Sequence, residues 1–228
     1  MIQYGKIIQA DTLDHLWLLA YKQLSKNPKV EQARHDNIIG EIIDAKLILE
    51  NPTKNIMLNE KRKLNLNYAI GELLWYESAN KNLSGIQLYT KNWDNLSDDG
   101  TTVNSNYGYC IQEKFGFNQF DYVYNLLVQD KSTKQAIIQI KRPELKESKD
   151  INCTLSLQFL IRENELLCIT TMRSNDIWLG TPYDIFYFTC LQIKLAMKLG
   201  LKLGRYIHNV GSLHLYQKDY IKAGDING

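Results

Sequence analysis

The chain has 228 residues, of which 44% are hydrophobic and 23% are charged, so it can bury a core without disulfides or a structural metal. This composition excludes a disordered chain. The chain has 27 Lys and Arg residues and 25 Asp and Glu residues, which gives a formal net charge of +2. This near-neutral charge does not indicate a basic surface that binds nucleic acid. Its first residues lack the pattern of a signal peptide, and no apolar run is long enough to span a membrane. We therefore expect a cytoplasmic protein (in the host cytoplasm if it is viral) that binds neither nucleic acid nor membrane.

The first half of the chain mixes helical and extended patterns. Apolar residues at helical spacing predict helices over 12–25 and 64–76 and a shorter helix over 121–128. The segment 37–49 is rich in Ile and Leu, which indicates a strand or a pair of strands. The polar segment 94–107 predicts a turn-rich loop.

The second half begins with three β-leaning runs and returns to a helix. The runs cover 136–142, 151–161 and 165–173, and they precede a helical pattern over 183–199 and a strand over 205–216. The apolar pattern of 136–142 (AIIQIKR) favours a strand buried on both faces. Because the elements do not alternate as βαβα, we predict one α+β domain over 1–228, with helices on one face of one large mixed sheet.

The four cysteines are too few and too scattered for a disulfide scaffold, and none has the spacing of a zinc site. Cys110, Cys168 and Cys190 lie inside apolar runs, which is typical of small buried core residues. Cys153 opens a predicted strand beside polar neighbours. That position permits a reactive thiol, although a buried core cysteine is the alternative.

Three further polar features allow a functional or a structural interpretation. Glu72 lies among apolar residues in AIGELLWY and is either on a solvated helix face or a buried functional acid. His214 in GSLHLY is either a hydrogen-bonded structural residue or a ligand-binding one. The segment 173–176 (RSND) can cradle an anion, or it is an ordinary polar turn.

Taken in order, these segments resemble the thymidylate synthase family, and within it the phage deoxycytidylate hydroxymethylases. The resemblance runs from about residue 67 to 220, and INCTLSLQFLI, MRSNDIWLGTPYD and NVGSLHLY are its most specific parts. It implies a thymidylate synthase-like fold, a homodimer and a one-carbon transferase. It also implies a pyrimidine nucleoside monophosphate as substrate, 5,10-methylenetetrahydrofolate as co-substrate, and no metal.

The resemblance implies catalytic roles for four residues. Cys153 matches the nucleophile whose thiolate adds to C6 of the pyrimidine, so that C5 can attack the methylene of the folate. Glu72 matches the acid that orders water and moves protons, and Tyr107 matches a tyrosine near the nucleophile. Asp184 occupies the position that reads the base, where synthases have asparagine.

Other matched residues are implied to bind substrate or folate. The substrate-binding residues are Arg173 and Ser174 for phosphate, His214 and Tyr216 for the sugar, and Gln158, Arg34 and Lys134; the folate-binding residues are Asp176 and Trp93. Lys134 stands, with Gln135, where the family has two arginines that reach the partner's site, and Thr154 replaces the histidine after the nucleophile. The family's C-terminal segment, which closes over folate, is largely missing from this sequence, so the sequence does not predict whether the chain still closes over folate.

Asp184 favours cytosine over uracil on chemical grounds. An asparagine amide can accept from N3–H of uracil and donate to O4, whereas a carboxylate can accept from the N4 amino group of cytosine. An unpaired buried group costs about 1–3 kcal/mol, which corresponds to roughly ten- to hundredfold discrimination. The alternative is that Asp184 is a surface residue that has drifted from the family pattern.

The leading hypothesis is a dCMP 5-hydroxymethylase, in which water adds to the new methylene carbon after tetrahydrofolate leaves. One alternative is a methylating or hydroxymethylating family member that acts on dCMP, CMP or dUMP, including a thymidylate synthase. Another is a non-catalytic homologue that binds nucleotide.

Overall fold

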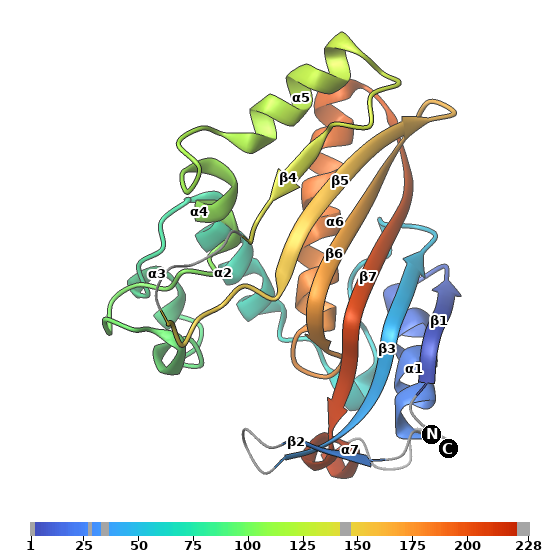
Figure 1. Cartoon of the computed structure of the whole chain (residues 1–228), viewed down its shortest axis with the longest axis vertical. Coiled ribbons are helices and arrows are strands. Elements are labelled where there is room, and N and C mark those ends of the chain that lie inside the picture. The colour runs from blue at the N-terminus through green and yellow to red at the C-terminus, as the bar shows by residue number, and fades with distance from the viewer. Residues whose placement is uncertain (1–2, 27–28, 33–36, 142–146, 223–228) are drawn as a thin grey trace. The chain divides into compact units, whose positions relative to one another are not determined.

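The computed structural model describes residues 3–26, 29–32, 37–141 and 147–222 (Figure 1). The chain forms two compact units: unit 1 comprises residues 1–64 with 162–228, and unit 2 comprises residues 65–161. Each unit contains both helices and strands, so the α+β class is confirmed. The organisation of 1–228 as one catalytic domain stays a prediction.

Unit 1 is built on a mixed sheet in the order β1-β3-β7-β6, with β2 paired to β3. The strands are β1 (Gln3–Ala10), β2 (Lys29–Gln32), β3 (Asn37–Leu49), β6 (Glu165–Asp176) and β7 (Lys202–Tyr216). The β1/β3 and β6/β7 pairs are parallel, whereas the β2/β3 and β3/β7 pairs are antiparallel. Because β6 and β7 are parallel, their carboxyl ends meet at one edge of the sheet.

Two helices of unit 1, α1 (Leu13–Ser25) and α6 (Thr181–Leu199), cover one face of this sheet (Figure 1). The other helices of unit 1 are the 3-10 helix η1 (Glu60–Arg62) and α7 (Gln217–Lys222). Helix α1 packs on β1, β3 and β7, α6 packs on β6 and β7, and the two helices touch. Thr12 caps α1 by accepting the backbone N–H of His15, and Gly200, at φ 66°, ends α6. Fully buried Trp17 and Phe188 are among the largest core side chains.

Unit 2 is mainly helical. Its elements are α2 (Leu66–Glu77), α3 (Ser84–Gln87), η2 (Asp94–Leu96), α4 (Tyr107–Gln112), α5 (Gln119–Gln129), β4 (Ile137–Gln139) and β5 (Thr154–Arg162). Helix α2 contacts α3 and α4, and both α4 and α5 contact β4. Strands β4 and β5 are antiparallel, with Ile138 opposite Leu157.

Most predicted elements are confirmed to within a few residues, and two differences have physical causes. Strand β1 was not predicted, because its exposed residues Tyr4–Ile7 give it no apolar face of regular period. The prediction that 136–142 is buried on both faces is wrong for this chain: Ile138 is buried, whereas Ile137 is 38% exposed. In the described part of the chain, no helix combines the length and apolarity of a membrane span.

Gly108, the second residue of α4, packs directly against the end of α2. A Cβ atom at this position would lie 1.5 Å from the carbonyl oxygen of Tyr76, far inside contact distance. We therefore expect Gly108→Ala to lower the free energy of unfolding by about 3 kcal/mol or more, because backbone must move. Urea denaturation measures this. Gly200→Ala, where only the left-handed φ is at stake, should cost about 1 kcal/mol; equal costs for the two variants would contradict the packing argument.

Candidate active site

Glu72 lies in α2, and its side chain is only 6% exposed. The alternative of a solvated helix face is thus wrong for Glu72, and its role as a functional acid stays a prediction. Tyr68, one helical turn earlier, donates its hydroxyl hydrogen to Oε1 of Glu72, and the indole N–H of Trp93 donates to the Tyr68 hydroxyl at 3.1 Å. Sequence reasoning missed Tyr68, although its i, i+4 spacing from Glu72 is a signal for such a contact.

Aromatic contacts connect two other predicted residues to α2. The ring of Trp93 meets the ring of Trp75 edge-on, with centroids 5.2 Å apart. Tyr76, the next residue of α2, contacts the ring of Tyr107 at 5.1 Å. Trp93 and Tyr107 are therefore both tied to the helix that carries Glu72.

Cys153 immediately precedes β5 and is half-buried, which leaves its thiol partial access. The hydroxyl of Thr154, the next residue, donates to the hydroxyl of Tyr107 at 2.8 Å in a buried contact. On the other side, the fully buried Asn152 has its Oδ1 3.5 Å from Nζ of Lys114. These contacts fix the backbone on both sides of Cys153.

The other cysteines are placed differently. Cys110 and Cys168 are fully buried, which confirms them as core residues, and burial raises the pKa of the Cys168 thiol. Cys190 on α6 is only half-buried, so the core interpretation fits it less well. No group of three or more His, Cys, Asp or Glu residues in the described ranges is arranged to hold a metal ion.

A second group of predicted residues lies where β6 and β7 end in unit 1. Ser174 and Asp176 belong to β6, so the alternative of an ordinary polar turn for this segment is wrong. The β6/β7 register places Asp176 opposite His214, and Oγ of Ser174 lies 3.5 Å from Nδ1 of His214. The rings of His214 and Tyr216 meet edge-on at 5.2 Å. Arg173, also on β6, is exposed.

Asp176 presents a buried acceptor. Its Oδ1 accepts the backbone N–H groups of Trp178 and Leu179, whereas its Oδ2 has no hydrogen-bond partner among the described residues. Burial raises the pKa of Asp176, while the two backbone N–H groups and the charge of His214 act in the opposite direction. A buried Oδ2 that lacks a donor among the described residues fits a ligand that offers an N–H group.

Asp184 lies in the first turn of α6 and is half-buried. Its Oδ2 accepts a hydrogen bond from Nδ2 of Asn175 at 2.8 Å. A Cβ atom on Gly180 would lie 3.0 Å from that nitrogen and 3.3 Å from that oxygen, so only glycine leaves this pair undisturbed. A carboxylate held in this way is not a drifted surface residue.

Three predicted residues remain. The amide Nε2 of Gln158, on β5, donates to the backbone carbonyl of Lys134 at 2.9 Å. The side chain of Lys134 is exposed. Arg34 lies outside the described residues.

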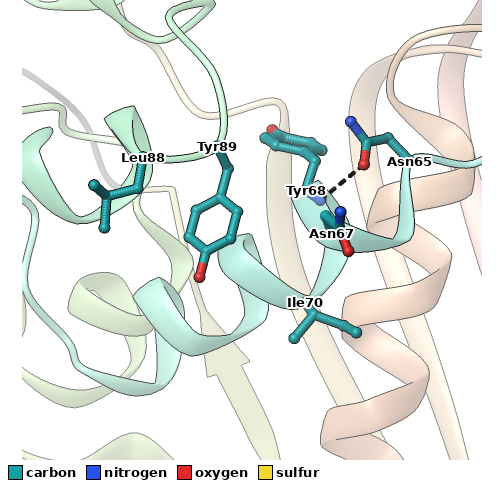
Figure 2. Close-up of a pocket in the computed structure, with 6 residues that line it drawn as sticks. All are labelled: Asn65, Asn67, Tyr68, Ile70, Leu88 and Tyr89. Carbon is teal, nitrogen blue, oxygen red and sulfur yellow. Dashed lines mark hydrogen bonds between the residues drawn. The ribbon is translucent and has the colours of Figure 1, made fainter.

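A hollow of about 530 Å³ opens in unit 2 between the start of α2 and the segment after α3 (Figure 2). It is lined by Asn65, Asn67, Tyr68, Ile70, Leu88 and Tyr89. None of the predicted site residues lines it. One residue nevertheless connects the hollow to Glu72. Tyr68 lines the hollow and donates a hydrogen bond to the carboxylate of Glu72.

Buried His208, on β7, makes stability depend on pH. Complete burial lowers its pKa from 6.5 to about 3, so the folded chain binds fewer protons than the unfolded chain between those values. The free energy of unfolding should therefore fall as the pH is lowered from about 6.5 towards 3, by up to about 1.4 kcal/mol per pH unit. Urea denaturation at several pH values tests this, and a slope equal to that of His208→Gln would contradict it.

The comparisons with known proteins agree with this arrangement. Residues 18–224 match the family model for thymidylate synthase. The chain is 29% identical over 194 residues to the deoxycytidylate 5-hydroxymethyltransferase of Enterobacteria phage T4, covering 79% of this chain and 76% of that relative. It is also 29% identical over 197 residues to the deoxyuridylate hydroxymethyltransferase of Bacillus phage SP01, covering 80% and 51%. It is 29% identical over 161 residues to the thymidylate synthase of Bacillus licheniformis, covering 66% and 57%.

The fold is shared with a solved structure, the thermostable thymidylate synthase A from Bacillus subtilis. That similarity has a TM-score of 0.75 at 23% identity and covers 92% of this chain and 83% of the other. The predicted thymidylate synthase-like fold is thus confirmed. Because the family model spans both units and nearly the whole chain, the protein belongs to the thymidylate synthase family and is a folate-dependent one-carbon transferase.

Proposed function

We propose that the protein is a dCMP 5-hydroxymethylase, which converts dCMP, 5,10-methylenetetrahydrofolate and water into 5-hydroxymethyl-dCMP and tetrahydrofolate. The observation that carries this proposal is Asp184. It stands where synthases have asparagine, and its Oδ2 accepts a hydrogen bond from Nδ2 of Asn175. A carboxylate acceptor suits the N4 amino group of cytosine and does not suit O4 of uracil.

In this proposal Cys153 and Glu72 perform the covalent chemistry. The thiolate of Cys153 adds to C6, so that C5 becomes nucleophilic and forms a bond to the one-carbon unit that the folate supplies. Loss of the C5 proton and departure of tetrahydrofolate leave an exocyclic methylene. Water, oriented by Glu72, adds its oxygen to that carbon, and the electron pair returns through C5 to C6 and expels the thiolate.

The remaining residues bind the two substrates. We assign the phosphate to Arg173 and Ser174, the sugar hydroxyl to His214 and Tyr216, and the nucleotide further to Gln158. We assign the folate to Asp176, whose Oδ2 is a buried acceptor, and to Trp93. We also propose a homodimer in the cytoplasm, in which the exposed Lys134 reaches the phosphate bound by the partner.

Release of tritium from C5 tests the proposal. Incubation with methylenetetrahydrofolate should release tritium from C5-labelled dCMP at least about ten times faster than from dUMP. Release from dUMP but not from dCMP would overturn the assignment of substrate. Labelled CMP in a third reaction distinguishes ribose from deoxyribose.

A second candidate is a dUMP enzyme that methylates or hydroxymethylates. It is favoured by the similarity to the deoxyuridylate hydroxymethyltransferase and to the synthase, which have the same 29% identity as the deoxycytidylate relative. This candidate requires Asp184 to pair with O4 of uracil as well as N3–H, which needs a proton on the carboxyl group. The dUMP reaction above separates the two candidates.

Tyr68 should matter for turnover because it donates to Glu72. We expect Tyr68→Phe to lower kcat with dCMP about tenfold, since a hydrogen bond to a charged group contributes about 1.5–3 kcal/mol, and to change KM less. Steady-state tritium release measures both constants. Tyr89→Phe, which removes a hydroxyl from the same hollow, is the control and should leave kcat within about twofold. Equal effects of the two variants would show that Tyr68 does not act through Glu72.

A further inference from the structure

Asp184 is the end of a series of buried polar contacts that runs back through β6 and β7. Asn175 of β6 donates to Asp184, and its Oδ1 lies 3.0 Å from Nε2 of His208. Nδ1 of His208 lies 2.8 Å from the hydroxyl of Tyr206, which lies 3.0 Å from Oγ1 of Thr170. Asn175 is 4% exposed, and His208, Tyr206 and Thr170 are fully buried, so water does not compete for the contacts among these four residues.

The chemistry of the groups fixes the direction of each bond. Oδ1 of Asn175 is approached by two groups, Nε2 of His208 and the hydroxyl of Thr181 at 2.5 Å. A carbonyl oxygen can only accept, so both groups donate to it, and the amide N–H is turned towards Asp184. His208 is uncharged because burial lowers its pKa to about 3. Its single proton is therefore on Nε2.

The far end of the series follows from that proton. Since Nδ1 of His208 carries none, it accepts from the hydroxyl of Tyr206. The series thus points its donors one way, from Tyr206 to Asp184. Turning the Asn175 amide over would place an oxygen against the carboxylate of Asp184.

The titratable neighbours of this series carry no charge near neutral pH. Burial raises the pKa values of Tyr206 and Cys168 and lowers that of His208. Asp176 follows Asn175 on β6, so its side chain points to the opposite face of the sheet. The negative charge of Asp184 is one of the causes that raise the pKa of Tyr206, after burial and Cys168.

We propose that Asn175 is a positioning residue which, with its amide oriented by His208, holds Asp184 as an ionised acceptor and so selects cytosine over uracil. This inference rests on the proposed role of Asp184 as the residue that reads the base. Asn175 stands at position x of R-S-x-D, and His208 lies six residues before His214.

The test combines a titration with a specificity ratio. In Asn175→Leu, which keeps the size but removes the donor, the midpoint of the Asp184 carboxyl titration, followed by carbon-13 NMR, should rise by about one to two pH units. The signal is assigned by its absence in Asp184→Asn. The ratio of kcat/KM for dCMP over dUMP should fall about tenfold or more. An unchanged midpoint would overturn the proposal.

A matched control separates positioning from general destabilisation. Asn55 is equally buried in unit 1, and its Nδ2 donates to Thr189 at 2.8 Å. Asn55→Leu should lower stability by a similar amount but leave the Asp184 midpoint and the substrate ratio unchanged. A shift of the midpoint in this control as large as in Asn175→Leu would contradict the proposal.

A second pair of variants keeps the test decisive if Asn175→Leu does not fold. His208→Gln retains an N–H donor towards Asn175 and should keep the midpoint near that of the native protein, whereas His208→Phe should raise it. Equal midpoints in the two variants would also overturn the proposal. The NMR readout needs no catalysis, so a native enzyme that releases no tritium from dCMP would refute the proposed function and leave this measurement interpretable.

Discussion

Cys153→Ala should abolish the release of tritium from C5 of dCMP, with a loss of at least about four orders of magnitude. Without the thiolate there is no addition to C6, and C5 remains an aromatic carbon that cannot attack the one-carbon unit. The loss should be in kcat, because the phosphate and sugar contacts assigned to unit 1 are unchanged. Binding of dCMP, measured by calorimetry, should remain within about tenfold.

Cys190→Ala is the matched control for this variant. Cys190 is the other half-buried cysteine of the described chain, and it lies on α6. Its replacement should keep at least about half of the activity, because Cys190 has no assigned contact with either substrate and Cys→Ala removes only one sulfur atom. Activity that survives in Cys153→Ala at a native level would mean that the family's covalent mechanism does not operate here.

Asp184→Asn should invert the preference between dCMP and dUMP. The amide restores a donor for O4 and an acceptor for N3–H of uracil, while it sets its own N–H against the N4 amino group of cytosine. We expect kcat/KM for dCMP to fall about ten- to hundredfold and that for dUMP to rise by a similar factor. Competition between the two labelled nucleotides in one reaction measures the ratio directly.

Asp121→Asn makes the same chemical change on the exposed surface of α5 and should leave the ratio unaltered. A native ratio in Asp184→Asn would show that another residue reads the base. A loss of both activities without a change of ratio would instead assign Asp184 to a step common to both substrates.

The fold was predictable wherever one face of an element is regularly apolar. Helix α1 shows this, because its buried residues Leu13, Trp17 and Leu24 recur at helical spacing and Thr12 caps it as expected. Strand β1 could not be predicted in this way, since its exposed middle has no such period. The prediction that both faces of β4 are buried is also wrong, because a short run of apolar residues does not show which face of the strand the rest of the protein covers.

Candidate site residues can be predicted from the sequence where they belong to a motif, as Cys153, Glu72 and Asp184 do. Residues whose proposed role depends on contacts between distant parts of the chain cannot be predicted in this way. Asn175 and His208 lie 33 residues apart in the chain and meet only because β6 and β7 are parallel neighbours. No local pattern in the sequence records that pairing.

The mass of the product tests the central claim most directly. Native protein, dCMP and methylenetetrahydrofolate should give a nucleotide heavier than dCMP by one CH2O unit, which is the signature of a one-carbon transfer completed by water. A product heavier by one CH2 unit, or a product formed from dUMP alone, would contradict the account of a cytosine-specific hydroxymethylase.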